Sequence, residues 1–280
     1  MGIFVYILSS RLFMMFLIML GVALFVSSIG FKKYVWFISL GYGFSVCAIG
    51  ITLTVIYAEV LFSSDKLGVL LTLILLTVYG ARLGGYLLYR ELKSSAYNTK
   101  MKTEIKSGKN MTLFVRCCIW TSAALLYACQ TCPVLFRLEN GKDTDIVLVI
   151  GSSLSVLGFI VECVADYQKS AAKKKNPKRF VDTGLYKIVR CPNYFGELLI
   201  WTGIFVGGTV IYSIIWQWIA SVTGYVGIVY VMFSGARRLE ERQNRTYGKD
   251  PEYQAYFKKT PIMIPLVPLY SVIDWKWLVA

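Results

Sequence analysis

The stretch that decides the fold is GFIVECVADYQKSAAKKKNPKRFVDTGLYKIVRCPNYFGELLIWTGIFVGG, residues 158–208. Its first part is an apolar segment that carries two acids, Glu162 and Asp166. A lysine-rich connector and a turn at residues 182–184 then lead to a second apolar segment, which begins behind Arg190. Polar groups therefore gather where two apolar segments meet a basic loop, and we expect the chemistry of the chain to lie there.

The composition is typical of a membrane protein. The chain has 280 residues, of which 56% are hydrophobic and 16% charged, and its mean hydropathy is +0.57. Soluble domains average about 25% charged residues. Runs near the ~20 residues of a spanning helix recur along the chain, so the first run is not simply a cleaved signal peptide. They cover roughly residues 3–29, 34–62, 67–89, 112–136, 146–165, 194–215 and 217–236. We predict an all-α polytopic bundle with about seven transmembrane helices, forming a single membrane domain over residues 1–280.

The net charge of +14 is concentrated in three stretches, residues 90–109, 169–190 and 237–259. Lys and Arg in short loops mark the cytoplasmic side of a membrane. This rule places all three stretches inside, the N-terminus outside and the C-terminus in the cytoplasm. The same charge also suits a polyanionic ligand such as a dinucleotide. A nucleic-acid partner is not expected, because the sequence has no soluble module with a basic face or aromatic readers.

The cysteines and histidines limit the possible chemistry. There are seven cysteines and no histidine, and Cys129-x-x-Cys132 is a single CxxC pair. A zinc site typically needs four Cys or His ligands, so we expect no metal. A histidine base is excluded.

Ionisable residues in the apolar runs are informative, because each costs about 2.5–3.5 kcal/mol on insertion scales. In the third run, Tyr79, Arg82, Tyr86 and Arg90 follow intervals of three, four and four, which places them on one helix face. They are either functional or a structural set, with Arg82 paired to a buried acid and the tyrosines as interfacial anchors. Gly84-Gly85 beside them permit close approach of another backbone or a ligand.

Three further positions carry acids or helix-start groups. Glu59 lies near the outer end of the second run, as an interfacial or a catalytic acid. Glu162 and Asp166 share a helix face and either bind a hydroxyl or an amide or pair with lysines. Residues 193–197 follow Pro192 at a predicted helix N-terminus, whose free N–H groups and dipole attract anions. This start, with Arg190 outside it, is either an anion site or a plain capped helix.

Residues 182–197, D-T-G-L-Y-K-I-V-R-C-P-N-Y-F-G-E, resemble the motif D-T-G-L-W-x-x-x-R-H-P-N-Y-F-G-E. This motif marks an uncharacterised membrane branch beside the steroid 5-alpha-reductases. The acids Glu162 and Asp166 upstream and the Tyr247-Gly-x-Asp-Pro segment downstream also fit that branch. The resemblance extends over residues 158–265 and more weakly over 67–92, whereas residues 1–62 are generic. Cys191 stands where the motif has histidine.

The resemblance implies an all-helical oxidoreductase that binds NADPH in its C-terminal half. Asp166 and Asn193 would bond the nicotinamide or its ribose. Tyr79 falls where the reductases polarise the substrate carbonyl, with Glu59 or Arg82 as a charged neighbour. The remaining cofactor residues would be Glu162, Tyr194 and Glu197 along the cavity and Lys173, Arg190, Arg237 and Arg245 at the phosphates.

Three functions follow from these features. The first is an NADPH-dependent reductase of a conjugated double bond in a steroid, polyprenoid or fatty-acyl lipid that enters from the bilayer. The alternative is an S-adenosylmethionine-dependent membrane methyltransferase of the isoprenylcysteine or phospholipid type, which has a similar R-H-P-x-Y-x-G-E helix start. The third is a lipid-binding membrane protein without catalysis. In a eukaryote we expect the endoplasmic reticulum membrane.

Overall fold

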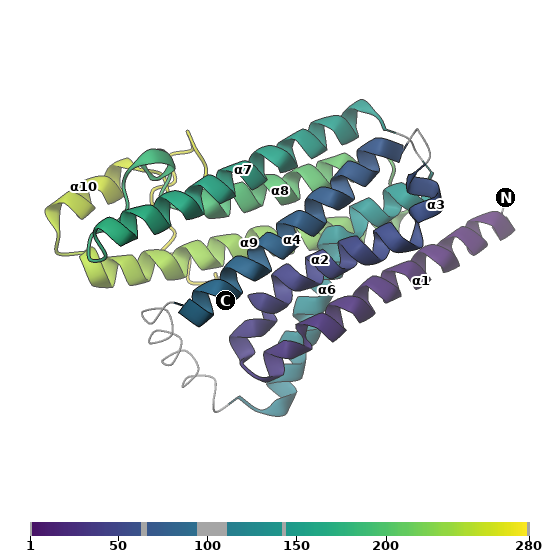
Figure 1. Cartoon of the computed structure of the whole chain (residues 1–280), viewed down its shortest axis with the longest axis horizontal. Helices are drawn as coiled ribbons and strands as arrows, with labels where there is room; N and C mark the ends of the chain where they lie inside the picture. Colours follow the sequence, from purple (N-terminus) through teal and green to yellow (C-terminus); the bar gives the residue numbers. More distant parts are fainter. Residues whose placement is uncertain (1, 63–65, 94–110, 142–143, 279–280) are drawn as a thin grey trace. The chain divides into compact units, whose positions relative to one another are not determined.

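The computed structural model describes residues 2–62, 66–93, 111–141 and 144–278, and these residues form helices and no strand. The predicted all-α class is confirmed. The chain forms two compact units: unit 1 contains Met1–Ser152 and Ile204–Gly224, and unit 2 contains Ser153–Gly203 and Tyr225–Ala280. Figure 1 shows the helices, coloured along the sequence.

Six helical segments among the described residues are long and apolar enough to cross a membrane. The remaining predicted segment, residues 194–215, forms α8, Pro192–Gly208, whose 17 residues reach only about 26 Å. This is shorter than the ~30 Å hydrocarbon core of a bilayer. The spans are Arg11–Phe31, Tyr34–Ile56, Leu67–Lys93, Leu113–Glu139, Ile146–Lys175 and Ile215–Tyr247. The predicted orientation of the termini stays a prediction. Of the first basic stretch on which it rests, residues 90–109, the greater part, residues 94–109, lies outside the described residues.

The helices differ from the apolar runs at their ends. The run at 34–62 is divided into the 3₁₀ turn η2, Tyr34–Phe37, then α2, Leu40–Ile56, and the short α3, Ala58–Leu61. Two helices continue past the apolar sequence: α7 spans Ile146–Lys175 and α9 spans Ile215–Tyr247. Hydropathy marks only the part of a helix at membrane depth, so it does not detect a polar continuation.

In unit 1, α2 and α4 (Leu67–Lys93) run side by side because glycines remove the side chains between them (Figure 1). A Cβ on Gly43 would lie 2.6 Å from the backbone nitrogen of Gly84, and one on Gly80 would lie 2.5 Å from that of Cys47. The predicted close approach is thus found at Gly84. It is absent at Gly85, where an added Cβ would meet nothing within 4 Å.

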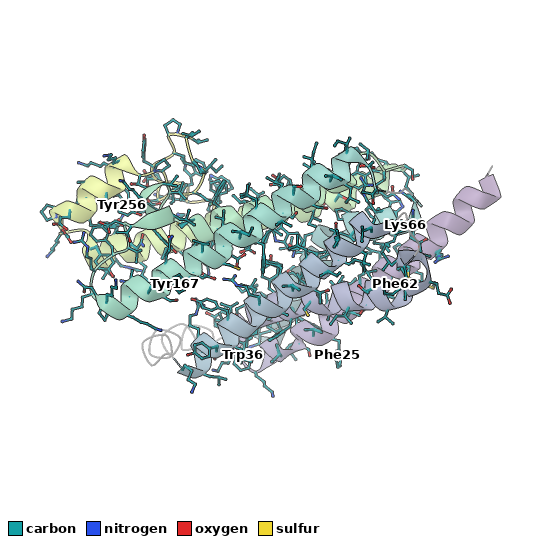
Figure 2. The ribbon with its side chains drawn as sticks, turned by 45° about the horizontal axis from the view of Figure 1, so that its top comes forward. Phe25, Trp36, Phe62, Lys66, Tyr167 and Tyr256 are labelled. Carbon is teal, nitrogen blue, oxygen red and sulfur yellow. The ribbon has the colours of Figure 1, made fainter. Side chains whose placement is uncertain are left out.

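The central helix of unit 1 is α6, Leu113–Glu139, which packs against α1 (Gly2–Ser27), α2 and α4. Every residue from 127 to 138 is buried. The outer surface is apolar: Phe25 and Phe62, labelled in Figure 2, are 81% and 75% exposed. An exposed apolar surface around a buried helix is what a lipid environment requires.

Unit 2 contains α7 from Ser153 onward, α8 up to Gly203, α9 from Tyr225 onward, and α10, Pro251–Lys259. Helix α10 begins at Pro251, and the Asp250 side chain caps it by accepting from Glu252 N at 2.9 Å. Tyr256 of α10, labelled in Figure 2, donates to the carbonyl of Tyr186 in the 3₁₀ turn η4, Gly184–Lys187.

The turn before η4 needs glycine. Gly184 has φ +62° and an added Cβ there would collide with Gln168, whose Oε1 accepts from Leu185 N at 2.9 Å. This contact fastens the turn at residues 182–184 to α7. Because η4 leads directly to α8, the turn also sets where α8 begins.

Candidate functional site: a polar cluster on α7, α8 and α9

The start of α8 is held against α7 by a direct backbone contact. A Cβ on Gly196 would lie 2.7 Å from the Gly158 carbonyl oxygen and 2.8 Å from the Glu162 nitrogen. Ser155 adds a hydrogen bond of 2.9 Å to the carbonyl of Ile200. The glycine of the N-Y-F-G-E motif is therefore required by packing, and it brings Glu162 on α7 close to the α8 start.

Two buried acids flank this contact. Glu162 is 3% exposed and Glu197, the residue after the packing glycine, is 7% exposed. Asp166 lies one turn after Glu162 on α7 and is partly buried. Carboxylates at such depth in an apolar bundle are costly unless they accept hydrogen bonds, and all three acids have polar or charged interactions within the protein.

The N-terminus of α8 presents a buried acceptor. Asn193 Oδ1 is buried and has no hydrogen-bond partner among the described residues. The next residue, Tyr194, packs its ring on α9, where a Cβ on Gly235 would lie 3.4 Å from the phenol oxygen. Asn193 is thus positioned at a helix start with an unused acceptor beside an aromatic ring.

The facing side of α9 supplies a hydroxyl and two cations that the sequence analysis missed. Ser234 is fully buried and its Oγ has no hydrogen-bond partner among the described residues. Arg238 and Arg242 follow at i+4 and i+8, are exposed, and lie within electrostatic range of the Tyr194 hydroxyl. The spacing of four residues was the signal in the sequence, because it places all three on one helix face.

Cys191, at the position of the motif histidine, is 2% exposed, and its backbone nitrogen donates to the Ile262 carbonyl at 2.8 Å. Burial raises the pKa of this thiol to about 12, while the nearby charges of Arg190 and Lys169 act in the opposite direction. A thiol with this pKa stays protonated at neutral pH, so Cys191 is neither a thiolate nucleophile nor a proton shuttle there.

Arg190 and Arg237, expected at phosphates, instead hold the chain after α10. We call residues 260–278 the C-terminal strap. Arg190 is 2% exposed, pairs with Glu240 at 3.2 Å, and donates to the strap carbonyls of Thr260 and Tyr270. Arg237 donates to the Ile273 carbonyl at 3.0 Å. Both guanidinium groups thus fix the strap to the rest of unit 2.

The other two expected phosphate ligands lie elsewhere on the unit. Lys173 donates to the carbonyls of Pro177 and Arg179 and to the Tyr247 hydroxyl, so it closes the connector after α7. Arg245 is exposed near the end of α9. Besides Arg190, the cations that the structure brings to Cys191 and Tyr194 are Lys169, Arg238 and Arg242.

In unit 1, Tyr79 is fully buried and its hydroxyl lies 3.0 Å from that of Tyr42. The ring of Tyr42 packs on Tyr127 of α6 with centroids 5.2 Å apart, and Tyr127 donates to the Phe37 carbonyl at 2.7 Å. This set of three phenols is the tyrosine cluster. Tyr42 and Tyr127 were not singled out from the sequence.

The two charged neighbours expected for Tyr79 are placed differently. Glu59 is exposed in α3, beyond Ile56 at the end of α2, which is roughly 21 Å along that helix from Tyr42. Arg82 lies over the ring of Tyr86, with its guanidinium carbon 5.6 Å from the centroid. One contact of the Tyr79 hydroxyl is a second phenol, that of Tyr42.

No group of three or more His, Cys, Asp or Glu residues that could hold a metal ion occurs in the part of the chain that the structure describes.

A family model described as "protein of unknown function (DUF1295)" matches residues 11–260, so the chain belongs to this family. No curated protein and no solved structure matches the chain.

Proposed function

We propose that this member of the family is a membrane-embedded, NADPH-dependent reductase of a conjugated carbon–carbon double bond in a steroid or other lipid. The proposal joins the resemblance of residues 158–265 to the steroid 5-alpha-reductase group with the polar cluster of unit 2. In a eukaryotic cell the endoplasmic reticulum would be its membrane.

The observation that carries the proposal is the pair of unused polar atoms on facing helices. Asn193 Oδ1 on α8 and Ser234 Oγ on α9 are buried without hydrogen-bond partners among the described residues, and the ring of Tyr194, next to Asn193, lies against Gly235, next to Ser234. Unpartnered buried polar groups cost about 1–3 kcal/mol each, so they favour a site completed by a ligand. The ligand must offer a donor to Asn193.

NADPH fits this set of groups. Its carboxamide and ribose hydroxyls are donors for Asn193 and for the carboxylates of Glu162, Asp166 and Glu197. Its phosphates need cations that are exposed rather than internally paired, which Arg238 and Arg242 are. When bound, NADPH supplies a hydride.

The residues of unit 1 have a separate task in this proposal. The hydroxyls of Tyr79 and Tyr42 lie 3.0 Å apart, and when Tyr42 donates to Tyr79 the proton of Tyr79 is left for a second acceptor and is polarised toward donation. Tyr79 would donate to the carbonyl oxygen of an enone and stabilise the negative charge that grows there as the double bond is reduced. Arg82 and Glu59 would not be needed for this step.

The test is ligand-dependent thermal stability of the detergent-purified chain with NADPH and, separately, S-adenosylmethionine. A native-state ligand at 100 times its dissociation constant stabilises by about 2.7 kcal/mol, which such an assay detects. We expect stabilisation by NADPH. Stabilisation by S-adenosylmethionine alone would assign the site to methyl transfer, and no stabilisation by either would favour a non-catalytic lipid-binding protein.

Variants locate the site. The double variant Arg238→Gln, Arg242→Gln should weaken NADPH binding by at least about tenfold, because two phosphate contacts of roughly 1 kcal/mol or more are lost. The matched control removes the same charge from exposed lysines on α7, Lys174→Gln with Lys175→Gln. Equal loss in both double variants would mean that only the overall charge matters.

A further inference from the structure

The buried face of α6 contains one polar side chain that the proposed function does not use. Gln130 is 3% exposed, and neither its Oε1 nor its Nε2 has a hydrogen-bond partner among the described residues. It lies roughly 26 Å along the helix from Leu113 and 14 Å from Glu139. An amide at that depth of a membrane helix has no bulk water to bond.

The polar groups around Gln130 are satisfied, which makes the amide the exception. Thr131 donates back to the Tyr127 carbonyl at 2.7 Å, and Cys132 donates to the Cys129 carbonyl at 2.9 Å. Tyr127 itself bonds the Phe37 carbonyl. The local backbone is also fixed, because the missing side chain of Gly224 on α9 is what lets that helix lie on the α6 backbone at residues 129–130.

The position of Gln130 connects it with the tyrosine cluster. Tyr127 precedes it by three residues, so the two side chains belong to the same buried face of α6. Through Tyr127 and Tyr42 this face leads to the Tyr79 hydroxyl. A fully buried primary amide offers two donors and an acceptor, which match a carbonyl or hydroxyl oxygen.

We infer that unit 1 binds a lipid with an apolar body and at least one carbonyl or hydroxyl group, and that Gln130 is a binding residue for that oxygen. In so far as this lipid is the substrate, the inference rests on the proposed function; the binding itself does not require NADPH. A purely structural Gln130 would instead complete its bonds through buried water and would support the fold.

The two roles predict opposite effects of Gln130→Leu on stability. Leucine has a similar volume and removes an amide without protein partners, so the ligand-free variant should be as stable as the wild type or more stable. If Gln130 only anchors buried water, the substitution removes those bonds and lowers the midpoint of detergent unfolding. A lower midpoint would overturn the inference.

Binding is measured with tritiated cholest-4-en-3-one as the probe and the full chain in dodecyl maltoside. We expect the wild type to bind it, unlabelled 5α-cholestane to compete poorly, and Gln130→Leu to weaken probe binding about tenfold. Thr131→Val is the matched control, because Thr131 is next to Gln130 and its hydroxyl already donates to a carbonyl within the helix. No probe binding by the wild type, or equal binding by Gln130→Leu, would refute the inference.

The same samples separate this inference from the proposed reductase. Gln130→Leu should retain its stabilisation by NADPH, because unit 2 is unchanged. If NADPH fails to stabilise the wild type while the probe binds through Gln130, the reductase proposal fails and the lipid site stands. If NADPH stabilises the wild type while the probe does not bind through Gln130, the lipid site is rejected and the reductase proposal stands.

Discussion

Among the residues that the structure describes, each unit contains one fully buried arginine, and the two form the same kind of junction. Arg137 in unit 1 is 1% exposed, forms two hydrogen bonds with Asp145 at 2.8 and 3.1 Å, and donates to the Gly207 carbonyl at 2.6 Å. Arg190 in unit 2 combines Glu240 with the carbonyls of Thr260 and Tyr270. In both, a guanidinium joins an acid to backbone oxygens from distant parts of the chain.

The junctions differ in the depth of the acid. The Asp145 side chain is 32% exposed, whereas that of Glu240 is 1% exposed and also accepts from Val272 N at 3.0 Å. Water can stabilise Asp145 if its arginine is removed, but it cannot reach Glu240. The cost of breaking a buried ion pair therefore depends on how well water can reach the charged partner that remains.

The largest effect is expected for Arg190→Met. It leaves the Glu240 carboxylate buried without a counter-charge, and such losses typically cost about 3–5 kcal/mol. The free energy of unfolding, measured by dodecyl sulfate titration, should fall by that amount. NADPH binding should fall as well. Arg190 lies directly before α8, and its bonds to the strap hold the start of that helix in place.

The double variant Arg190→Met, Glu240→Gln provides the control. Glutamine keeps an acceptor for Val272 N and removes the charge, so the double variant should recover most of the lost stability. If it is as unstable as the single variant, the buried charge is not the cause.

A smaller loss, about 1–3 kcal/mol, is expected for Arg137→Met. The guanidinium bonds to Asp145 and Gly207 are lost, but the remaining carboxylate is partly hydrated. The same titration measures it. A loss equal to that of Arg190→Met would show that exposure of the acid does not decide the cost.

The smallest effect concerns acid pH. Hydrogen bonding to Arg137 lowers the pKa of Asp145 from its ordinary value of 3.8. Because the folded pKa lies below the unfolded one, the stability that this carboxylate contributes is present above pH 3.8 and is lost as the pH falls through the folded pKa. The wild type should therefore exceed Asp145→Asn in stability at pH 6, and the difference should shrink below pH 4. A constant difference would contradict this.

Local patterns in the sequence predicted the helices and the position of the polar cluster, because hydrophobic runs and a helix-start motif are local features. The run at 146–165 led to α7, and the motif at 182–197 led to the start of α8. The pairing of Arg190 was not predictable in this way. Its bonds join residues 50 to 80 positions apart, and a basic residue beside a helix start has the same local appearance whether it meets a phosphate or a buried acid.

Gln130 and Ser234 were not predicted as site residues for a related reason. A single uncharged polar residue barely alters the hydropathy of an apolar run, and only the fold reveals whether its bonds are completed. Glu59 was selected by its order in the chain, but the end of α2 lies beyond the reach of Tyr79.

The bonds of Arg190 also set an order of events during synthesis. A ribosome makes Arg190 and the whole of α8 before it makes Glu240, and it makes Tyr270 later still. The guanidinium must therefore remain hydrated, or be held by a temporary partner, while the 50 residues up to Glu240 are added, and its bond to Tyr270 can form only after 80. The start of α8 gains its permanent anchor only when the strap folds back, so a nascent chain can insert its membrane helices well before unit 2 is able to hold a ligand.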